Sequence, residues 1–218
     1  NEYTIYHLVY LFIFVFYKSI MLTKSEKTTK YIIETVAPIF NKKGYEATSM
    51  KDITSATSLT KGAIYGNFKN KEAIAIAAFK ENVNALLKKI AKHQNQSKSP
   101  LEKLYLITDF YTNYYDYSKK LGGCPILNIG VDAKHQETSL LEHVRSVINK
   151  TQYNISKLID WGKETSEIKQ EVNSQLFAKR LYSHIQGAIF MTYTMDDEQY
   201  LKQAMVEMNS IIKNEIEK

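Results

Sequence analysis

Residues 44–73 read GYEATSMKDITSATSLTKGAIYGNFKNKEA, and this stretch contains the signals that start two short helices. Ser49 and Asp52 have the spacing of a capping box, so a short helix is expected to begin directly after Ser49. A tight turn comes next, and Thr60 is placed to cap another helix. Two short helices around a tight turn make a helix-turn-helix.

An amphipathic helix is expected immediately before this stretch, from Lys24 to Lys43, with Gly44 just past its end. Its apolar residues recur at i, i+3 and i+4, and they are Ile32, Ile33, Val36, Ala37 and Phe40. The residues that can pack inward against this helix are Ile53, Leu59, Ile64 and Phe68. The sequence therefore predicts a three-helix unit, with its second and third helices at residues 50–57 and 61–68.

Residue types that suit a DNA reader are left on the outer face of this unit. Small Gly62 and Ala63 let the helix backbone approach base edges, whereas Lys61 and Asn67 can hydrogen-bond to bases or phosphates. Unpaired N–H groups at helix N-termini add to the capacity for binding phosphate. The candidate DNA-binding residues are Thr48, Ser49, Thr60, Lys61, Gly62, Ala63, Tyr65, Asn67 and Lys71.

The same stretch resembles the DNA-binding signature of the tetracycline-repressor (TetR) family of bacterial transcriptional regulators. The run KGxxYxxFxxKE, which begins at Lys61, is the most specific part, and the likeness covers about residues 25–75. The resemblance implies that Thr48 and Tyr65 hold phosphates and that the helix beginning at Lys61 faces the major groove. It also implies that Lys71 anchors the DNA backbone.

Three residues depart from the family pattern. Ser58 stands in the turn where the family usually has glycine at positive φ, which predicts a local strain of roughly 1 kcal/mol. Gly66 and Asn67 replace a pair that is commonly rich in His or Tyr, so the base preference stays open.

The net charge of +6 on the 218-residue chain is concentrated in one segment. Residues 21–97 hold 13 lysines against six acidic residues, whereas residues 98–218 hold 15 basic and 16 acidic residues. This asymmetry indicates a polyanion-binding module joined to a charge-balanced domain. The alternative is a structural three-helix unit whose lysines only solvate its surface.

An all-α fold is expected, since 8 glycines and 3 prolines are too few for a loop-rich β-protein. We expect a helix-turn-helix DNA-binding domain at residues 21–75 and a C-terminal helical bundle for ligand sensing and dimerisation at residues 76–218. The helices expected after the DNA-binding unit lie at residues 71–92, 99–118, 126–133, 139–164, 174–194 and 196–217.

Residues 1–20 differ in composition from the rest of the chain. The apolar run from Leu8 to Tyr17 is shorter than the roughly 20 residues that a transmembrane helix needs, and it lacks the flanks of a signal peptide. We expect an extraneous or disordered extension, with the native chain starting at Met21; a signal or anchor segment is the alternative. The resulting expectation is a cytoplasmic protein with no membrane partner.

Aromatic residues are abundant in the C-terminal segment, and the chain holds 16 tyrosines. A pocket lined with rings and hydroxyls would suit a small, largely apolar effector, although core packing is the alternative for any single ring. The candidate ligand-binding residues are Tyr105, Phe110, Tyr114, Cys124, Trp161 and Tyr182.

Cys124 is the only cysteine, so a disulfide within the chain and a multi-cysteine metal site are excluded. The run from Gly122 to Asn128, GGCPILN, resembles a Gly-Cys-x-x-x-Asn segment in a subset of the family, some of which sense electrophiles or oxidants through the cysteine. A thiol at a helix entrance can have a lowered pKa, whereas a small buried packing residue is the alternative. The five histidines show no metal-ligand spacing, so no metal and no cofactor are expected.

Apolar stripes mark the last two expected helices. The first contains Leu176, Phe177, Leu181, Ile185, Ala188 and Ile189, and the second contains Leu201, Met205, Met208, Ile211 and Ile212. Internal core is one interpretation, and a four-helix dimer interface, which the family resemblance implies, is the other. A two-fold dimer would read two successive major-groove faces of double-stranded DNA.

These features predict a ligand-responsive DNA-binding regulator, a repressor that binds a palindromic operator as a homodimer. A small apolar or electrophilic effector would release it. The alternatives are an architectural DNA-binding protein without a sensor and a small-molecule enzyme with a basic helical module. The sequence contains no catalytic motif, so we expect no enzyme.

Overall fold

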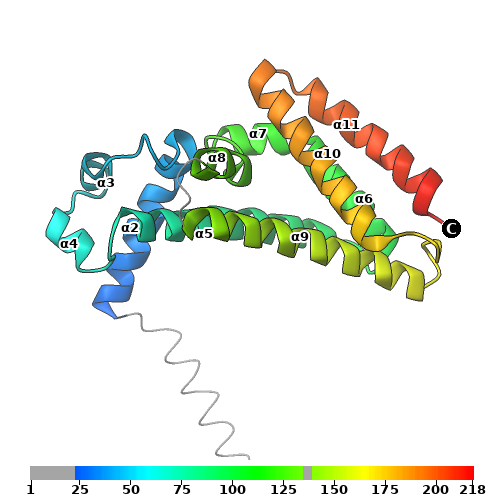
Figure 1. Ribbon diagram of the computed structural model, residues 1–218, viewed down its shortest axis with the longest axis horizontal. Helices are drawn as coiled ribbons and strands as arrows, with labels where there is room; N and C mark the ends of the chain where they lie inside the picture. The colour runs from blue at the N-terminus through cyan, green and yellow to red at the C-terminus, as the bar shows by residue number, and fades with distance from the viewer. Residues whose placement is uncertain (1–22, 135–138) are drawn as a thin grey trace, which may run out of the picture.

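A computed structural model describes residues 23–134 and 139–218 and confirms the expected all-α fold (Figure 1). The extension predicted at residues 1–20 lies outside the described residues. The elements are α2 (Lys24–Lys43), α3 (Met50–Thr57), α4 (Lys61–Tyr65), α5 (Lys71–Gln94), α6 (Pro100–Thr112), α7 (Tyr114–Lys119), α8 (Pro125–Ala133), α9 (Ser139–Glu164), α10 (Ser174–Met195), α11 (Gln199–Ile211) and the π-helical turn η2 (Ile212–Ile216). In the described ranges, none of these helices combines the length and apolar character required to span a bilayer.

The first three helices form the expected compact unit at one end of the molecule, which we call the helix-turn-helix unit (Figure 1). Ser49 caps α3 through a reciprocal capping box with Asp52, and the Thr60 hydroxyl caps α4 by accepting from the Ala63 N–H. Ile53 and Ile64 are fully buried in the apolar core that includes residues of α2, as their spacing predicts. Local capping and one shared apolar core therefore define this unit.

The turn between α3 and α4 contains the strained residue that the sequence predicts. Ser58 adopts the left-handed conformation, with φ 55° and ψ 24°. Residues other than glycine, asparagine and aspartate adopt this conformation at a free-energy cost, because their Cβ atom approaches the following carbonyl oxygen.

Helix α5 connects the helix-turn-helix unit to the rest of the molecule. Asn70 caps it by accepting from the Ala73 N–H at 2.8 Å. The buried residues of α5 form one continuous apolar face: Ile74, Ala75, Ala78, Phe79, Val83 and Leu86. The domain boundary predicted after residue 75 thus falls inside a helix that packs against both parts.

Helices α6–α11 form a second body, which we call the sensor bundle, and α10 and α11 lie side by side in it (Figure 1). The single helix expected at residues 99–118 is broken at Asn113, whose φ of −108° and ψ of 14° separate α6 from α7. Helix α11 begins at Gln199 because Asp196 leaves the helical region at φ 51°. Both differences come from single residues whose backbone conformation the apolar spacing does not reveal.

The two apolar stripes of α10 and α11 mostly face the inside of the bundle. Phe177, Leu181 and Ile185 are buried on α10, and Met205 and Met208 are buried on α11. Leu176, by contrast, is 65% exposed. The interpretation of these stripes as internal core is therefore confirmed for most of their residues.

Replacing Ser58 with glycine should stabilise the fold, because glycine reaches positive φ without the Cβ contact. We expect the free energy of unfolding to rise by about 0.5–1 kcal/mol in urea titrations. Ser55→Gly, at an exposed position inside α3, is the matched control and should lower stability by about the same amount. A loss of stability in Ser58→Gly would show that the turn carries no strain.

Candidate nucleic-acid interface and effector pocket

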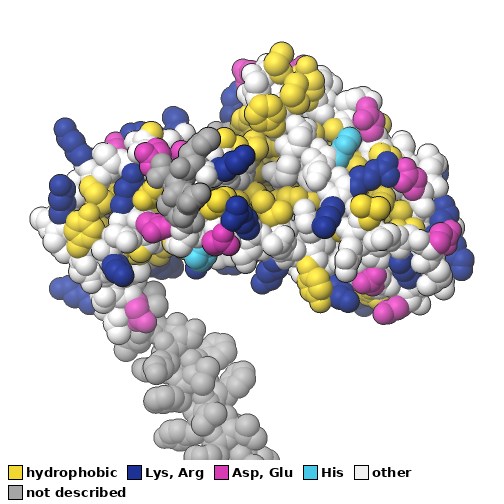
Figure 2. All heavy atoms as spheres, viewed as in Figure 1, with side chains coloured by type: hydrophobic (Ala, Val, Ile, Leu, Met, Phe, Trp, Pro, Cys, Tyr) yellow, Lys and Arg dark blue, Asp and Glu magenta, His cyan; other side chains and the backbone are white. Residues whose placement is uncertain are grey.

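The outer face of α4 is exposed and carries small and polar residues. Lys61, Gly62 and Ala63 are exposed in its first turn, and the Tyr65 side chain is 45% exposed. Lysine side chains surround the end of the molecule that α3 and α4 form (Figure 2). Such a face can approach a polyanion, with the small residues allowing close contact of the backbone.

Thr48 lies in a different place from the one that the sequence suggests. Its side chain is fully buried, and its hydroxyl donates to the Gly44 carbonyl at 2.6 Å. A side chain in this position has no access to a phosphate, so the prediction of a Thr48 hydroxyl contact is wrong for this conformation. Ser49 remains exposed, but its hydroxyl is engaged by Asp52 in the capping box.

Asn67 is also engaged inside the protein. Its Oδ1 accepts from the hydroxyls of Ser25 at 3.1 Å and Thr29 at 3.0 Å, and its Nδ2 donates to the Ala63 carbonyl at 2.9 Å. These bonds tie the end of α4 to α2. The Asn67 amide is therefore engaged within the protein in this conformation, and its contact with a base or a phosphate stays a prediction.

Lys71 lies at the start of α5, beside the loop that precedes α3. Its Nζ sits 4.5 Å from the centroid of the Tyr45 ring and donates to the Glu46 carbonyl at 3.4 Å. A cation held over an aromatic ring is oriented by it, and the ammonium keeps further donors for a phosphate. The geometry is thus compatible with the predicted role of Lys71.

One acidic group on this surface is neutralised by a lysine. Lys43 Nζ lies 2.7 Å from Asp52 Oδ1. The hydrogen bonds from Lys43 and Ser49 hold the pKa of the Asp52 carboxyl well below its usual range. Since the pair has no net charge, the unpaired lysines of α3 and α4 determine the sign of the surface.

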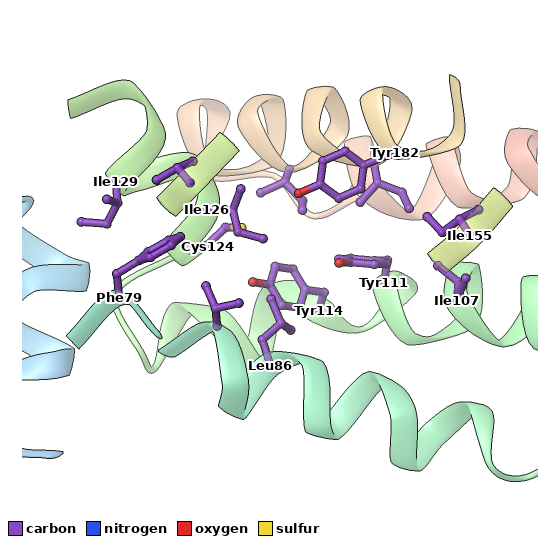
Figure 3. Close-up of a cluster of buried hydrophobic side chains, with 14 of the residues drawn as sticks. Phe79, Leu86, Ile107, Tyr111, Tyr114, Cys124, Ile126, Ile129, Ile155 and Tyr182 are labelled. Atoms are coloured by element: carbon purple, nitrogen blue, oxygen red, sulfur yellow. The ribbon is translucent and has the colours of Figure 1, made fainter. Parts of the chain in front are cut away.

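A cavity of about 350 Å³ lies between α5, α6, α9 and α10, and we call it the effector pocket. Its lining is mostly apolar and consists of Leu87, Ile90, Ala91, Gln94, Lys103, Ile107, Tyr111, Thr151, Asn154, Ile155, Leu158, Tyr182 and Ile185. Four of these lining residues, Tyr111, Tyr182, Ile107 and Ile155, are labelled in Figure 3, where the Tyr182 ring lies above that of Tyr111. A cavity of this size and lining suits a small apolar ligand.

Only Tyr182 among the predicted ligand residues lines this pocket. Phe110 and Tyr114 line a separate groove on the other side of the α5–α6 pair, together with Lys89 and Lys92. Tyr111 lines the pocket but is not among the ligand residues predicted from the sequence, although its helical spacing from Ile107 places both residues on one face of α6.

The remaining predicted ligand residues lie outside the pocket. The Tyr105 hydroxyl donates to Glu217 at 2.7 Å, and Trp161 is 39% exposed beneath the ammonium of Lys103. Those two residues are engaged near the far end of the bundle. The set predicted as one pocket is therefore distributed over several surfaces.

Cys124 is buried among the rings rather than exposed to a ligand. It is 1% exposed and lies beside Tyr114 and Ile126 (Figure 3). Burial raises the pKa of its thiol, although hydrogen bonds from the Leu127 N–H and the Tyr114 hydroxyl act in the opposite direction. The expected lowering of the pKa is thus wrong, and the packing alternative describes this thiol better. In the described residues, no cluster of metal-binding side chains is found.

Comparisons with known proteins cover both parts of the chain. A family model described as "Tetracyclin repressor-like, C-terminal domain" matches residues 100–208. A second model, described as "Bacterial regulatory proteins, tetR family", matches residues 32–78. Together they span most of the helix-turn-helix unit, part of α5 and most of the sensor bundle.

Individual relatives agree with these models. A TetR-family transcriptional regulator from Cytophaga hutchinsonii has a crystal structure with a TM-score of 0.85 and 32% identity, covering 90% of this chain and 98% of that one. The fatty acid metabolism regulator protein of Bacillus subtilis is 24% identical over 181 residues, which are 80% of this chain and 89% of the relative. The HTH-type transcriptional repressor DhaR of a Mycobacterium species is 25% identical over 161 residues, covering 73% and 79% of the two chains.

The native thiol should react slowly with iodoacetamide, because it is both buried and largely protonated near neutral pH. We expect alkylation at least about tenfold slower than in the same chain unfolded in urea. The rate should rise with pH through and beyond the ordinary thiol pKa of about 8.5, as thiolate forms. Mass spectrometry gives the extent of modification.

An exposed thiol provides the control for this measurement. Ser146→Cys on α9, in a Cys124→Ser chain, should react at the rate of the unfolded protein. Equal rates for native Cys124 and this control would restore the interpretation of Cys124 as a reactive sensor.

Proposed function

We propose, since the chain belongs to the TetR family of bacterial transcriptional regulators, that it works as a ligand-responsive repressor in the cytoplasm. In this proposal it binds a palindromic operator as a homodimer. A small, largely apolar effector then releases it. The observation that carries the DNA-binding part is the exposed, capped first turn of α4, with Lys61, Gly62 and Ala63 available to the major groove.

A dimer surface is available on the outside of α10 and α11. The exposed residues of α10 alternate by three and four, which places Leu176, Arg180, Ser183, Gly187, Phe190 and Thr194 on one face. The neighbouring face of α11 exposes Gln203, Val206 and Ser210 with the same spacing. Apolar side chains gather over the upper end of this helix pair (Figure 2). A self-complementary four-helix contact would cover both faces.

The effector pocket supports an apolar ligand and a route to the DNA-binding unit. Leu87, Ile90 and Gln94 of α5 line it, while Lys71 lies at the other end of the same helix. A ligand that binds more tightly to one placement of α5 shifts the population toward that placement. One relative is named a fatty acid metabolism regulator protein, and this name agrees with the proposal of an apolar effector.

An electrophilic effector is the second candidate that the sequence offers. The buried Cys124 and its raised pKa give this candidate little support. We therefore favour reversible binding of an apolar molecule.

The DNA-binding proposal is tested by selecting duplexes from a random pool with the full chain and measuring the dissociation constant at several salt concentrations. Lys71→Ala should weaken binding to every duplex and reduce the slope of log affinity against log salt by about 1.8, since each of the two protomers loses one phosphate contact worth about 0.9. Lys120→Ala, an exposed lysine after α7, is the control and should change neither quantity. Failure to enrich any duplex would contradict the proposed function, and an unchanged slope would remove Lys71 from the phosphate contacts.

The dimer surface is tested at Gly187, where an added Cβ meets nothing within 4 Å in the single chain. Gly187→Trp should leave the monomer folded and convert a dimer into a monomer in sedimentation experiments, because an indole would block close helix contact. Asn149→Trp on the exposed side of α9 should leave the association unchanged. A Gly187→Trp chain that remains dimeric would place the interface elsewhere.

A further inference from the structure

We infer that Asn41, Gly122, Asn128 and Asp132 form a latch that fixes the orientation of the helix-turn-helix unit on the sensor bundle. This inference rests on the proposed DNA-binding function and assigns a role to the Gly122–Asn128 segment that does not involve its thiol. Asn128 and Asp132 are positioning residues in this assignment. They touch the DNA-binding unit rather than DNA.

The first part of the latch consists of hydrogen bonds at the C-terminal end of α2. The Asn41 Nδ2 donates to the carbonyls of Leu121 at 2.6 Å and Gly123 at 2.9 Å, and the Asn41 side chain is buried. The Asn128 Nδ2 in turn donates to the Asn41 carbonyl at 2.9 Å. The last carbonyls of a helix have no partner within it, so the sensor bundle supplies one here.

The second part holds the loop that leads into α3. The N–H groups of Tyr45 and Glu46 both donate to Asp132 Oδ2, and the bond from Glu46 is 3.2 Å long. Hydrogen bonds to an ionised acceptor are about twice as strong as those between neutral groups. Asp132 thus binds the backbone three and four residues before Ser49, the residue that caps α3.

Two glycines allow the sensor bundle and the DNA-binding unit to approach each other closely at the latch. A Cβ on Gly44, which has φ 80°, would lie 3.0 Å from Asp132 Oδ2. A Cβ on Gly122, at φ 84°, would lie 2.9 Å from the Lys42 Cα, where a real side chain does not fit. The sequence motif from Gly122 to Asn128 therefore has the shape needed for docking α2.

The latch lies between the effector pocket and the DNA-binding face. Helix α8 carries Asp132 near its end and begins after Cys124, which lies beside Tyr114 (Figure 3). The ring centroid of Tyr114 lies 5.1 Å from that of Tyr111, which lines the effector pocket. A surface groove of about 470 Å³ adjoins the latch, and Asn41, Gly122, Asn128 and Asp132 lie in its lining. In a dimer, the angle that the latch sets determines the separation of the two recognition helices, and hence the half-site spacing that they accept.

The spacing preference tests this role directly. Wild-type protein first selects its duplex from a random pool, and the dissociation constant is then measured for that duplex and for versions with one base pair added or removed at the centre. We expect wild type to lose at least about tenfold in affinity for the altered spacings, since the recognition helices no longer match both half-sites. Asp132→Ala and Asn128→Ala should lose less than about threefold. Asp132→Asn, which keeps an acceptor oxygen, should fall between wild type and Asp132→Ala.

Two further measurements separate positioning from simple loss of fold. Amide exchange of Tyr45 and Glu46 should accelerate in Asp132→Ala, while affinity for unselected DNA and its salt slope stay as in wild type. Asp160→Ala, a surface carboxylate paired with Lys157, is the control and should keep the wild-type spacing profile. Spacing profiles of Asp132→Ala and Asn128→Ala that match wild type would overturn the latch, while DNA binding itself would stand. If wild type selects no duplex, the proposed function fails and the latch with it.

Discussion

The packing of α5 against α2 at one end and against the sensor bundle at the other is the constraint on which the rest of this structure depends. The same helix buries Ile74 and Phe79 near α2 and presents Leu87 and Ile90 to the effector pocket. Interiors packed at crystal-like density transmit displacement rather than absorb it. A molecule bound beside Ile90 therefore acts on helix α5, and the other end of this helix carries Lys71.

Features with local causes could be predicted from the sequence. Ser49 and Thr60 form caps with residues three positions away, so their pattern alone locates the starts of α3 and α4. The left-handed Ser58 is indicated by the family pattern, which usually has glycine at this position of the turn. The family resemblance added the assignment of this unit to DNA, which the comparisons confirm at the level of the family.

Features that depend on distant partners could not be predicted. Asn67 is of a type that reads bases, but Ser25 and Thr29, some forty residues away, occupy its amide oxygen. Tyr105 and Trp161 are as aromatic as Tyr182, yet only Tyr182 lines the effector pocket, because the direction of each ring depends on how the helices pack. Helical spacing identifies the buried face of α10 but does not say whether a face is covered by the same chain or by another.

The latch residues of the sensor bundle address backbone atoms of the DNA-binding unit. Asn128 binds the carbonyl of residue 41, Asp132 binds the N–H groups of residues 45 and 46, and Gly122 rests against the backbone of residue 42. Backbone groups stay the same when side chains mutate. The outward side chains of the DNA-binding unit are thus free to diverge toward new operator sequences without a compensating change in the sensor, so that recognition and docking can evolve separately.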